Sequence, residues 1–173
     1  MNISDWVVVV AIILAPIIAI QIQKFIERRQ MKIERQVKVF KLLMATRATP
    51  ISVAHVEALN MIDIEFYDNK KVTEAWKLLL DHFGNYPTDA NDPKFQDKLE
   101  TCIEKSKELL TDLLYEMGTS LNYHFDKVHL KRGAYLPKGH ADTWSDQEFI
   151  RRSLIGLFLG KVPIPIKLVD KEK

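Results

Sequence analysis

The segment Trp6–Gln23 constrains the fold of this chain more than any other feature, because it contains no charged residue. Its first part, WVVVVAIILAPIIAI, carries no strongly polar side chain. About 18 residues at 1.5 Å per residue form a helix roughly 27 Å long, close to the thickness of the bilayer hydrocarbon. The segment therefore predicts a transmembrane helix, with a modest kink at Pro16 because proline removes a backbone donor.

Two other interpretations of this segment are a buried core helix and a cleaved signal sequence. A signal sequence requires a basic region before the apolar stretch and small residues at the cleavage point. The leading residues MNISD contain Asp5 and neither Lys nor Arg, and IIAIQIQK offers no A-x-A pattern. Residues 1–23 are therefore predicted to be a retained transmembrane signal-anchor.

The distribution of charge predicts the orientation of the chain. All 25 Lys and Arg residues follow Gln23, and seven of them lie between residues 24 and 41, where the net charge is +5. From Leu42 onward, 18 basic and 20 acidic residues give a net charge of −2. Because positively charged flanks stay in the cytoplasm, the N-terminus is expected outside the cell and the C-terminal domain in the cytoplasm.

Residues 24–46 are predicted to continue the first helix as a basic juxtamembrane helix, since neither Gly nor Pro interrupts them. A narrow apolar stripe follows this helix at Ile22, Ile26, Ile33, Val37, Phe40 and Met44. Such a stripe is typical of a coiled coil or of a docked antiparallel neighbour, so either a homo-oligomer or a protein partner is expected. The cations predicted to contact anionic lipids of the bilayer are Lys24, Arg28, Arg29, Lys32 and Arg35. No specific nucleic acid is predicted as a partner.

Residues 47–160 are predicted to form a cytoplasmic α-helical domain. After a break at Pro50, Ser52 is placed to cap a helix through VAHVEALNMIDIEF. Further helices are expected in KKVTEAWKLLLDHFG, with Gly84 at its end, and from about residue 94 to residue 117.

A last helix is expected after a capping box formed by Ser145 and Glu148, and it is expected to end at Gly160. Residues 161–173 read as an extended tail because Pro163 and Pro165 alternate. The predicted fold class is all-α: a transmembrane helix that continues into the juxtamembrane helix, then a compact bundle of four or five helices with one irregular polar loop segment.

The polar loop segment, residues 124–142, concentrates the side chains best suited to a ligand. An anion is the favoured ligand, because Gly133 and Gly139 let backbone amides approach a phosphate closely. The anion-binding candidates are Arg47, Lys127, Lys131, Arg132, Lys138 and Arg151. The other polar candidates, which match no recognised metal spacing, are His124, Asp126, His129, His140 and Asp142. The sequence nevertheless favours a purely structural connection, packed through Tyr135, Leu136 and Trp144, over any ligand site.

Several stretches of the chain resemble a family that has been described only by its architecture. They are WVVVVAIILAPIIAIQIQK, KVFKLLMATRAT, HVEALNMIDIEFY, KKVTEAWK and FDKVHLKRGAYLPKGHAD. The chain looks like a member of an uncharacterised bacterial family of small proteins with one N-terminal membrane helix and a cytoplasmic α-helical domain. The resemblance implies a location in the bacterial inner membrane, and it supplies no activity, cofactor or site residue.

Two functions follow as expectations. The first is a membrane-anchored cytoplasmic helical module for protein interaction or regulation, which could form an oligomer through the juxtamembrane helix. The alternative is a sensor or hydrolase that binds phosphate or a nucleotide through residues 124–142. No catalytic residue is identified, no metal or other cofactor is predicted, and the sequence leans towards a protein that is not an enzyme.

Overall fold

A computed structural model describes the backbone of residues 3–161 and the side chains of residues 12–161. Within these residues the secondary structure consists of helices and turns without a strand, which confirms the all-α prediction. The predicted tail beyond residue 161 lies outside the described residues. So do the side chains of residues 6–11, where the uncharged segment begins.

Helix α1, Ile3–Thr46, is a single helix of 44 residues that contains Pro16 and passes without a break into the basic segment. This confirms that the apolar and juxtamembrane segments share one helix. The helix ends before Pro50, as predicted. Across the described part of the chain, no helix combines the length and the apolar character that a membrane crossing demands.

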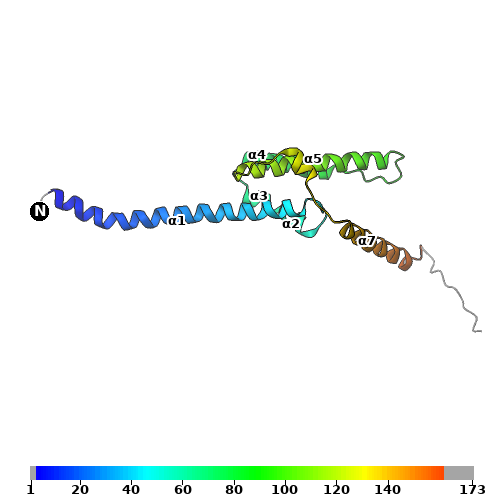
Figure 1. The fold of residues 1–173 in the computed structure, drawn as a ribbon, viewed down its shortest axis with the longest axis horizontal. Helices are drawn as coiled ribbons and strands as arrows, with labels where there is room; N and C mark the ends of the chain where they lie inside the picture. The colour runs from blue at the N-terminus through cyan, green and yellow to red at the C-terminus, as the bar shows by residue number, and fades with distance from the viewer. Residues whose placement is uncertain (1–2, 162–173) are drawn as a thin grey trace, which may run out of the picture. The chain divides into compact units, whose positions relative to one another are not determined.

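Helices α2, Val53–Asn60, and α3, Ile62–Glu65, follow the turn at Pro50. Ser52 is the N-cap of α2, as predicted: its hydroxyl accepts a hydrogen bond from the backbone N–H of His55 at 3.4 Å. Both helices pack against the C-terminal part of α1, and Figure 1 shows them beside it.

Helices α4, Lys70–Gly84, and α5, Phe95–Ser120, lie side by side as an antiparallel pair (Figure 1). Val72, Trp76 and Leu79 of α4 are buried, as its apolar spacing predicts. Leu80, directly after Leu79, is 51% exposed.

The polar loop segment is more helical than predicted. Asp126 caps the short helix α6, Lys127–Arg132, by accepting a hydrogen bond from the backbone N–H of His129 at 2.9 Å. Helix α7 spans Lys138–Phe158, so it begins at Lys138 and not at the predicted capping box of Ser145. The irregular part of the segment is therefore short.

The end of α7 is as predicted. Gly160 has a positive φ of 67°, and the backbone N–H groups of Gly160 and Lys161 donate to the carbonyls of Leu157 and Gly156. This is the Schellman pattern, in which glycine takes the left-handed conformation without a steric penalty.

The chain divides into two compact units, residues 1–134 and residues 135–173. The first unit contains the hydrophobic core, to which α1, α2, α3, α4 and α5 all contribute. Its most deeply buried apolar side chains are Leu43, Ile62, Phe66, Val72, Leu79, Leu113, Leu114 and Met117. The second unit contains α7, in which no residue is buried.

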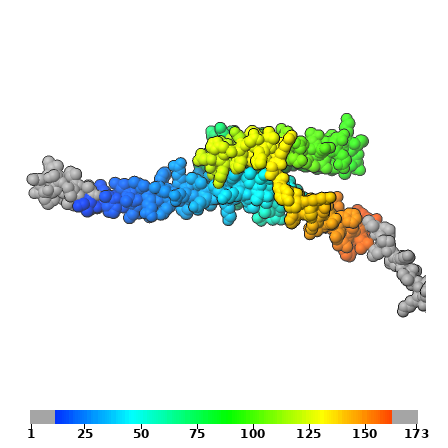
Figure 2. Space-filling model, in the orientation of Figure 1, coloured from blue at the N-terminus to red at the C-terminus, as the bar shows by residue number. Residues whose placement is uncertain are grey.

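The apolar stripe predicted on α1 is buried in one part and exposed in another. Phe40 is buried in the core and Met44 packs against the core, so this part of the stripe has its partner within the chain. Ile26 and Ile33 remain exposed. On the face shown in Figure 2, α1 extends beyond the helices that pack on its C-terminal part.

Candidate functional site

Arg47 links the C-terminal ends of α1 and α6. Its Nη1 donates to the carbonyl oxygen of Met44 at 2.6 Å, and its Nη2 donates to the carbonyl oxygen of Gly133 at 2.7 Å. A guanidinium group in this position satisfies carbonyls that helix ends leave without partners, and it interacts favourably with both helix dipoles. Its Nε is buried and has no hydrogen-bond partner among the described residues.

The lysines of α6 face the carboxylates of α5. Lys127 pairs with Asp112 at 2.7 Å, and its ammonium lies 4.7 Å from the ring centroid of Tyr115. Lys131 pairs with Glu104 at 2.7 Å and with Glu108 at 3.4 Å. Hydrogen bonds to these carboxylates raise the pKa of both lysines and lower the pKa of Glu104. The positive charge predicted for an anion site is therefore largely compensated within the first unit.

The remaining candidates of the first unit are exposed. His124 and His129 lie on the surface on either side of the N-cap Asp126, and Arg132 is exposed at the end of α6. Arg47 contacts this region through the carbonyl oxygen of Gly133, the residue that follows Arg132. No group of three or more His, Cys, Asp or Glu side chains with a metal-binding arrangement occurs among the residues described.

Four candidates lie in the second unit, on α7. Lys138, His140 and Asp142 are exposed in its first turns. Arg151 donates two hydrogen bonds of 2.7 Å to the carboxylate of Glu148, and Arg152 donates a third. These two arginines lower the pKa of Glu148 to about 2.

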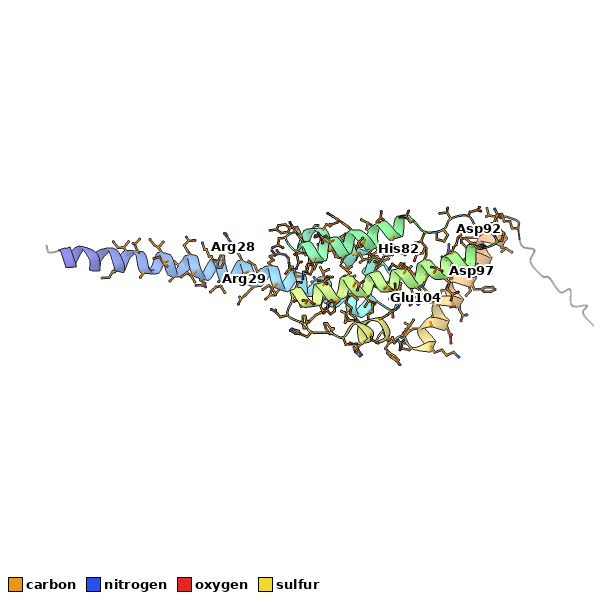
Figure 3. The ribbon with its side chains drawn as sticks, turned by 90° about the horizontal axis from the view of Figure 1, so that it is seen from above. Arg28, Arg29, His82, Asp92, Asp97 and Glu104 are labelled. Carbon is orange, nitrogen blue, oxygen red and sulfur yellow. The ribbon has the colours of Figure 1, made fainter. Side chains whose placement is uncertain are left out.

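The juxtamembrane cations separate into two groups. Lys32 pairs with Asp68, and Arg35 donates from Nε to the Glu65 carboxylate at 3.0 Å. The hydrogen bond from Lys32 lowers the pKa of Asp68. Of the five cations predicted to contact lipid, the other three, Lys24, Arg28 and Arg29, are exposed and form no ion pair with any described residue. Figure 3 shows Arg28 and Arg29 on α1, outside the packed helices.

A cluster of His82, Tyr86 and Ser106, which no sequence pattern indicates, lies between α4 and α5. His82 Nε2 lies 3.0 Å from the Cys102 carbonyl oxygen and 3.1 Å from Ser106 Oγ, and Tyr86 Oη lies 2.6 Å from Ser106 Oγ. Ser106 lies 24 positions from His82 and 20 from Tyr86, so no local sequence motif joins the three residues.

The directions of the hydrogen bonds in this cluster argue against an activated serine. A carbonyl oxygen only accepts hydrogen bonds, so the contact with Cys102 makes His82 Nε2 a donor. The Ser106 hydroxyl itself donates to the same carbonyl at 2.9 Å. A general base must instead accept the proton of the nucleophile. His82 therefore ties α4 to α5 and does not activate Ser106 in this arrangement.

A groove of about 570 Å³ lies between α1 and α2. Its apolar lining comes from Val39, Leu42, Ala58 and Met61. The charged side chains around it are Arg35, Lys38, Glu57 and Glu65. Apolar lining with charged residues of both signs suits a protein side chain better than an anion, because the opposite charges largely cancel.

The whole chain, residues 1–173, matches the sequence profile of DUF6680, a family of unknown function. The protein belongs to the DUF6680 family. Neither a curated protein nor a solved structure matches the chain. Membership of DUF6680 agrees with the resemblance to an uncharacterised family, and it assigns no role to the cations, the histidines or the groove described above.

Proposed function

We propose that this DUF6680 protein is a membrane-anchored helical module. Helix α1 holds it in a bacterial inner membrane, and the packed helices present a surface to a protein partner in the cytoplasm. In this proposal the N-terminus lies outside the cytoplasm, because the cations that follow the apolar segment stay on the cytoplasmic side.

The observation that carries the proposal is the all-round exposure of apolar side chains on α1. Large apolar residues at successive positions face the solvent in every direction around the helix. Those with described side chains are Ile12, Ile13, Leu14, Ile17, Ile18, Ile20 and Ile22. A helix that is apolar on all sides needs an apolar environment all round, and lipid supplies one.

Two further observations support the anchor. Lys24, Arg28 and Arg29 follow the apolar segment directly and are exposed, as expected for cations that contact anionic headgroups. In the same helix, Phe40 and Leu43 are part of the core. An anchor formed by α1 would therefore connect to the packed helices without a flexible linker.

The test of the anchor is membrane fractionation of the full-length chain with an alkaline carbonate wash. The wild-type protein is expected in the pellet, and Ile17→Lys/Ile18→Lys is expected to shift it to the supernatant, because each charge at the centre of a membrane helix is costly. The control Ile33→Lys lies outside the apolar segment and should stay in the pellet. Release of the wild-type protein would contradict the proposal.

The test of orientation uses reporters fused after Lys173. A fluorescent protein that folds in the cytoplasm should be active there, and alkaline phosphatase, which needs the periplasm, should be inactive. The opposite pattern would overturn the cytoplasmic location of the packed helices.

Self-association is the interaction that the exposed part of the stripe favours. Ile26 and Ile33 are exposed and Val37 is half-buried, so this part of α1 has apolar side chains available to a second copy. Two membrane-anchored copies are confined to one plane, which raises their effective concentration. Val37 therefore marks the position at which a parallel pair of α1 helices would approach.

The anion-binding alternative has weaker support. The α6 lysines are paired with carboxylates, and Arg151 is paired with Glu148. Thermal-shift measurements with inorganic phosphate and nucleotides test it directly, and a stabilisation that Arg47→Ala removes would favour it over the interaction module.

A further inference from the structure

The corner between α3 and α4 combines exposed apolar and basic side chains. Ile64 is 62% exposed and Tyr67 is 71% exposed. Lys70 and Lys71 begin α4 and are also exposed. We refer to Ile64, Tyr67, Lys70 and Lys71 as the α3–α4 corner.

Two of the acidic residues around this corner pair with cations of α1, and a third, Asp63, is hydrogen-bonded to a neutral group. The Asp63 carboxylate accepts a hydrogen bond from Trp76 Nε1 at 3.0 Å. Glu65 accepts one from Arg35, and Asp68 pairs with Lys32.

Neither lysine of the corner forms an ion pair with a described residue, although the exposed Glu74 lies one helical turn further along α4. The charged side chains within the corner as defined are therefore the two lysines.

The corner lies at the end of the packed helices that is nearest to the apolar segment. The ammonium of Lys32 on α1 is 5.1 Å from the ring centroid of Tyr67, which fixes the corner beside this residue. Figure 3 shows the direction: Arg28 and Arg29 lie on α1 just before one end of the packed helices, and Asp92, in the turn after α4, lies at the other end.

The distance along α1 places the corner within electrostatic range of a membrane. The rise from Gln23 to Lys32 is about 13 Å at 1.5 Å per residue. The headgroup region occupies roughly 5 to 8 Å of that distance. The remainder is close to the Debye length of about 8 Å at physiological ionic strength, and a tilt of α1 shortens it further.

We infer that the α3–α4 corner is a second membrane contact that docks on the headgroups of anionic lipids. This inference rests on the proposed anchoring by α1. Tyrosine is favoured at the membrane interface because its ring is apolar and its hydroxyl is polar, and exposed lysines attract anionic headgroups. With contacts at α1 and at the corner, the packed helices take a fixed orientation on the membrane surface.

The experiment measures the distance from the headgroups to nitroxide labels on the full-length chain in a Cys102→Ser background. One label is placed at Ile64→Cys, in the corner, and a matched label at the exposed Asn91→Cys, at the opposite end. A third label at Ile17→Cys reports on the anchor. The vesicles contain phosphatidylcholine, with or without phosphatidylglycerol, and a nickel-chelating lipid relaxes nitroxides near the headgroups.

In vesicles with phosphatidylglycerol, the label at Ile64→Cys is expected to relax faster than the label at Asn91→Cys. Charge reversal by Lys70→Glu/Lys71→Glu is expected to weaken docking by a factor on the order of 10 or more, since each lysine contributes about fivefold. The matched reversal Lys94→Glu/Lys105→Glu, on and beside α5, should leave the difference unchanged.

Equal relaxation at Ile64→Cys and Asn91→Cys, with the Ile17→Cys label inside the hydrocarbon, overturns the second contact and leaves the anchor intact. A label at Ile17→Cys that remains in water overturns the anchor and the second contact together.

Discussion

At the scale of single residues, the buried side chains of His55 and Glu65 are hydrogen-bonded to α1. Thr46 has one hydroxyl proton, which it donates to the Leu42 carbonyl at 2.7 Å, so it accepts from Nδ1–H of His55 at 2.8 Å. The side chain of Glu65 is 9% exposed and accepts from Arg35. Buried polar groups that are bonded in this way specify how α2 and α3 sit on α1, because any other placement would leave them without partners.

His55 makes the stability of the first unit depend on pH. Burial lowers the pKa of His55 below its ordinary value of 6.5, so below that pH the unfolded chain binds more protons than the folded chain. The free energy of unfolding should therefore be highest above pH 6.5 and should fall as the pH decreases towards the folded-state pKa. Denaturant titrations between pH 8 and pH 5, followed by the fluorescence of the buried Trp76, measure this dependence.

The control is a comparison of two histidine variants. His55→Gln removes the buried titrating group and should flatten the pH dependence, whereas the exposed His124→Gln should leave it as in the wild type. An unchanged pH dependence in His55→Gln would show that another group is responsible.

The two ion pairs between α1 and the α3 region should differ in strength. Glu65→Gln removes a largely buried, charge-assisted hydrogen bond and is expected to lower the free energy of unfolding by about 1 to 3 kcal/mol. Asp68→Asn removes an exposed pair and is expected to change it by less than about 1 kcal/mol. Urea denaturation of both variants tests the order, and an equal loss would show that the burial of Glu65 contributes nothing.

At the scale of helices, a close approach between α5 and its neighbours depends on one glycine. A Cβ atom at Gly118 would lie 3.1 Å from Phe125 Cδ2 and 3.6 Å from Phe40 Cζ. The rings of Phe40, Tyr123 and Phe125 pack together here, with centroids 5.5 to 5.9 Å apart. A side chain at residue 118 would therefore press on Phe125, where the chain leaves α5 towards α6.

Filling this space should destabilise the first unit. Gly118→Leu is expected to lower the free energy of unfolding by about 1 to 3 kcal/mol, because a well-packed site must shift to admit the new atoms. Gly84→Leu is the matched control, since a Cβ there has no neighbour within 4 Å and surface changes are worth about 0.5 kcal/mol or less. Thermal unfolding of both variants measures the difference, and equal melting temperatures would contradict the packing argument.

The helices were predictable from sequence where apolar spacing and capping residues agree. Ser52 and Gly84 mark the start of α2 and the end of α4 in this way, and Gly160 marks the end of α7. The start of α7 was missed because Gly139 and Thr143 are weak helix formers. Pro137 is its N-cap, and the carbonyl of Pro137 accepts hydrogen bonds from the backbone N–H groups of His140 and Ala141.

The site residues were less predictable than the helices, because ion pairs depend on which helices meet. Lys32 and Arg35 look like Lys24 in sequence, yet they bind carboxylates about 30 residues away, while Lys24 stays exposed. The α6 lysines resemble an anion site for the same reason: the α5 acids that compensate them are distant in sequence and adjacent only after folding.

At the scale of the whole molecule, α1 serves two roles along one helix. Its C-terminal part completes the core, whereas the exposed apolar side chains of its N-terminal part have no partner among the described residues of the first unit. A movement of one part is passed directly to the other, since the helix is continuous and no loop intervenes. Self-association through α1 would consequently bring two sets of packed helices into a fixed arrangement.

This arrangement predicts disulfide crosslinking at Val37. In a Cys102→Ser background, Val37→Cys should form a covalent dimer in membranes under mild oxidation, because in the proposed pair the exposed part of the stripe would face a second copy. Met31→Cys is the control: it is exposed but lies about 120° further round the helix, so it should crosslink much less. Gel electrophoresis without reductant measures both yields. Equal yields would indicate random collision, and a monomer in both variants would mean that Ile26 and Ile33 are covered by something other than a second copy, because side chains of this size are costly to leave in water.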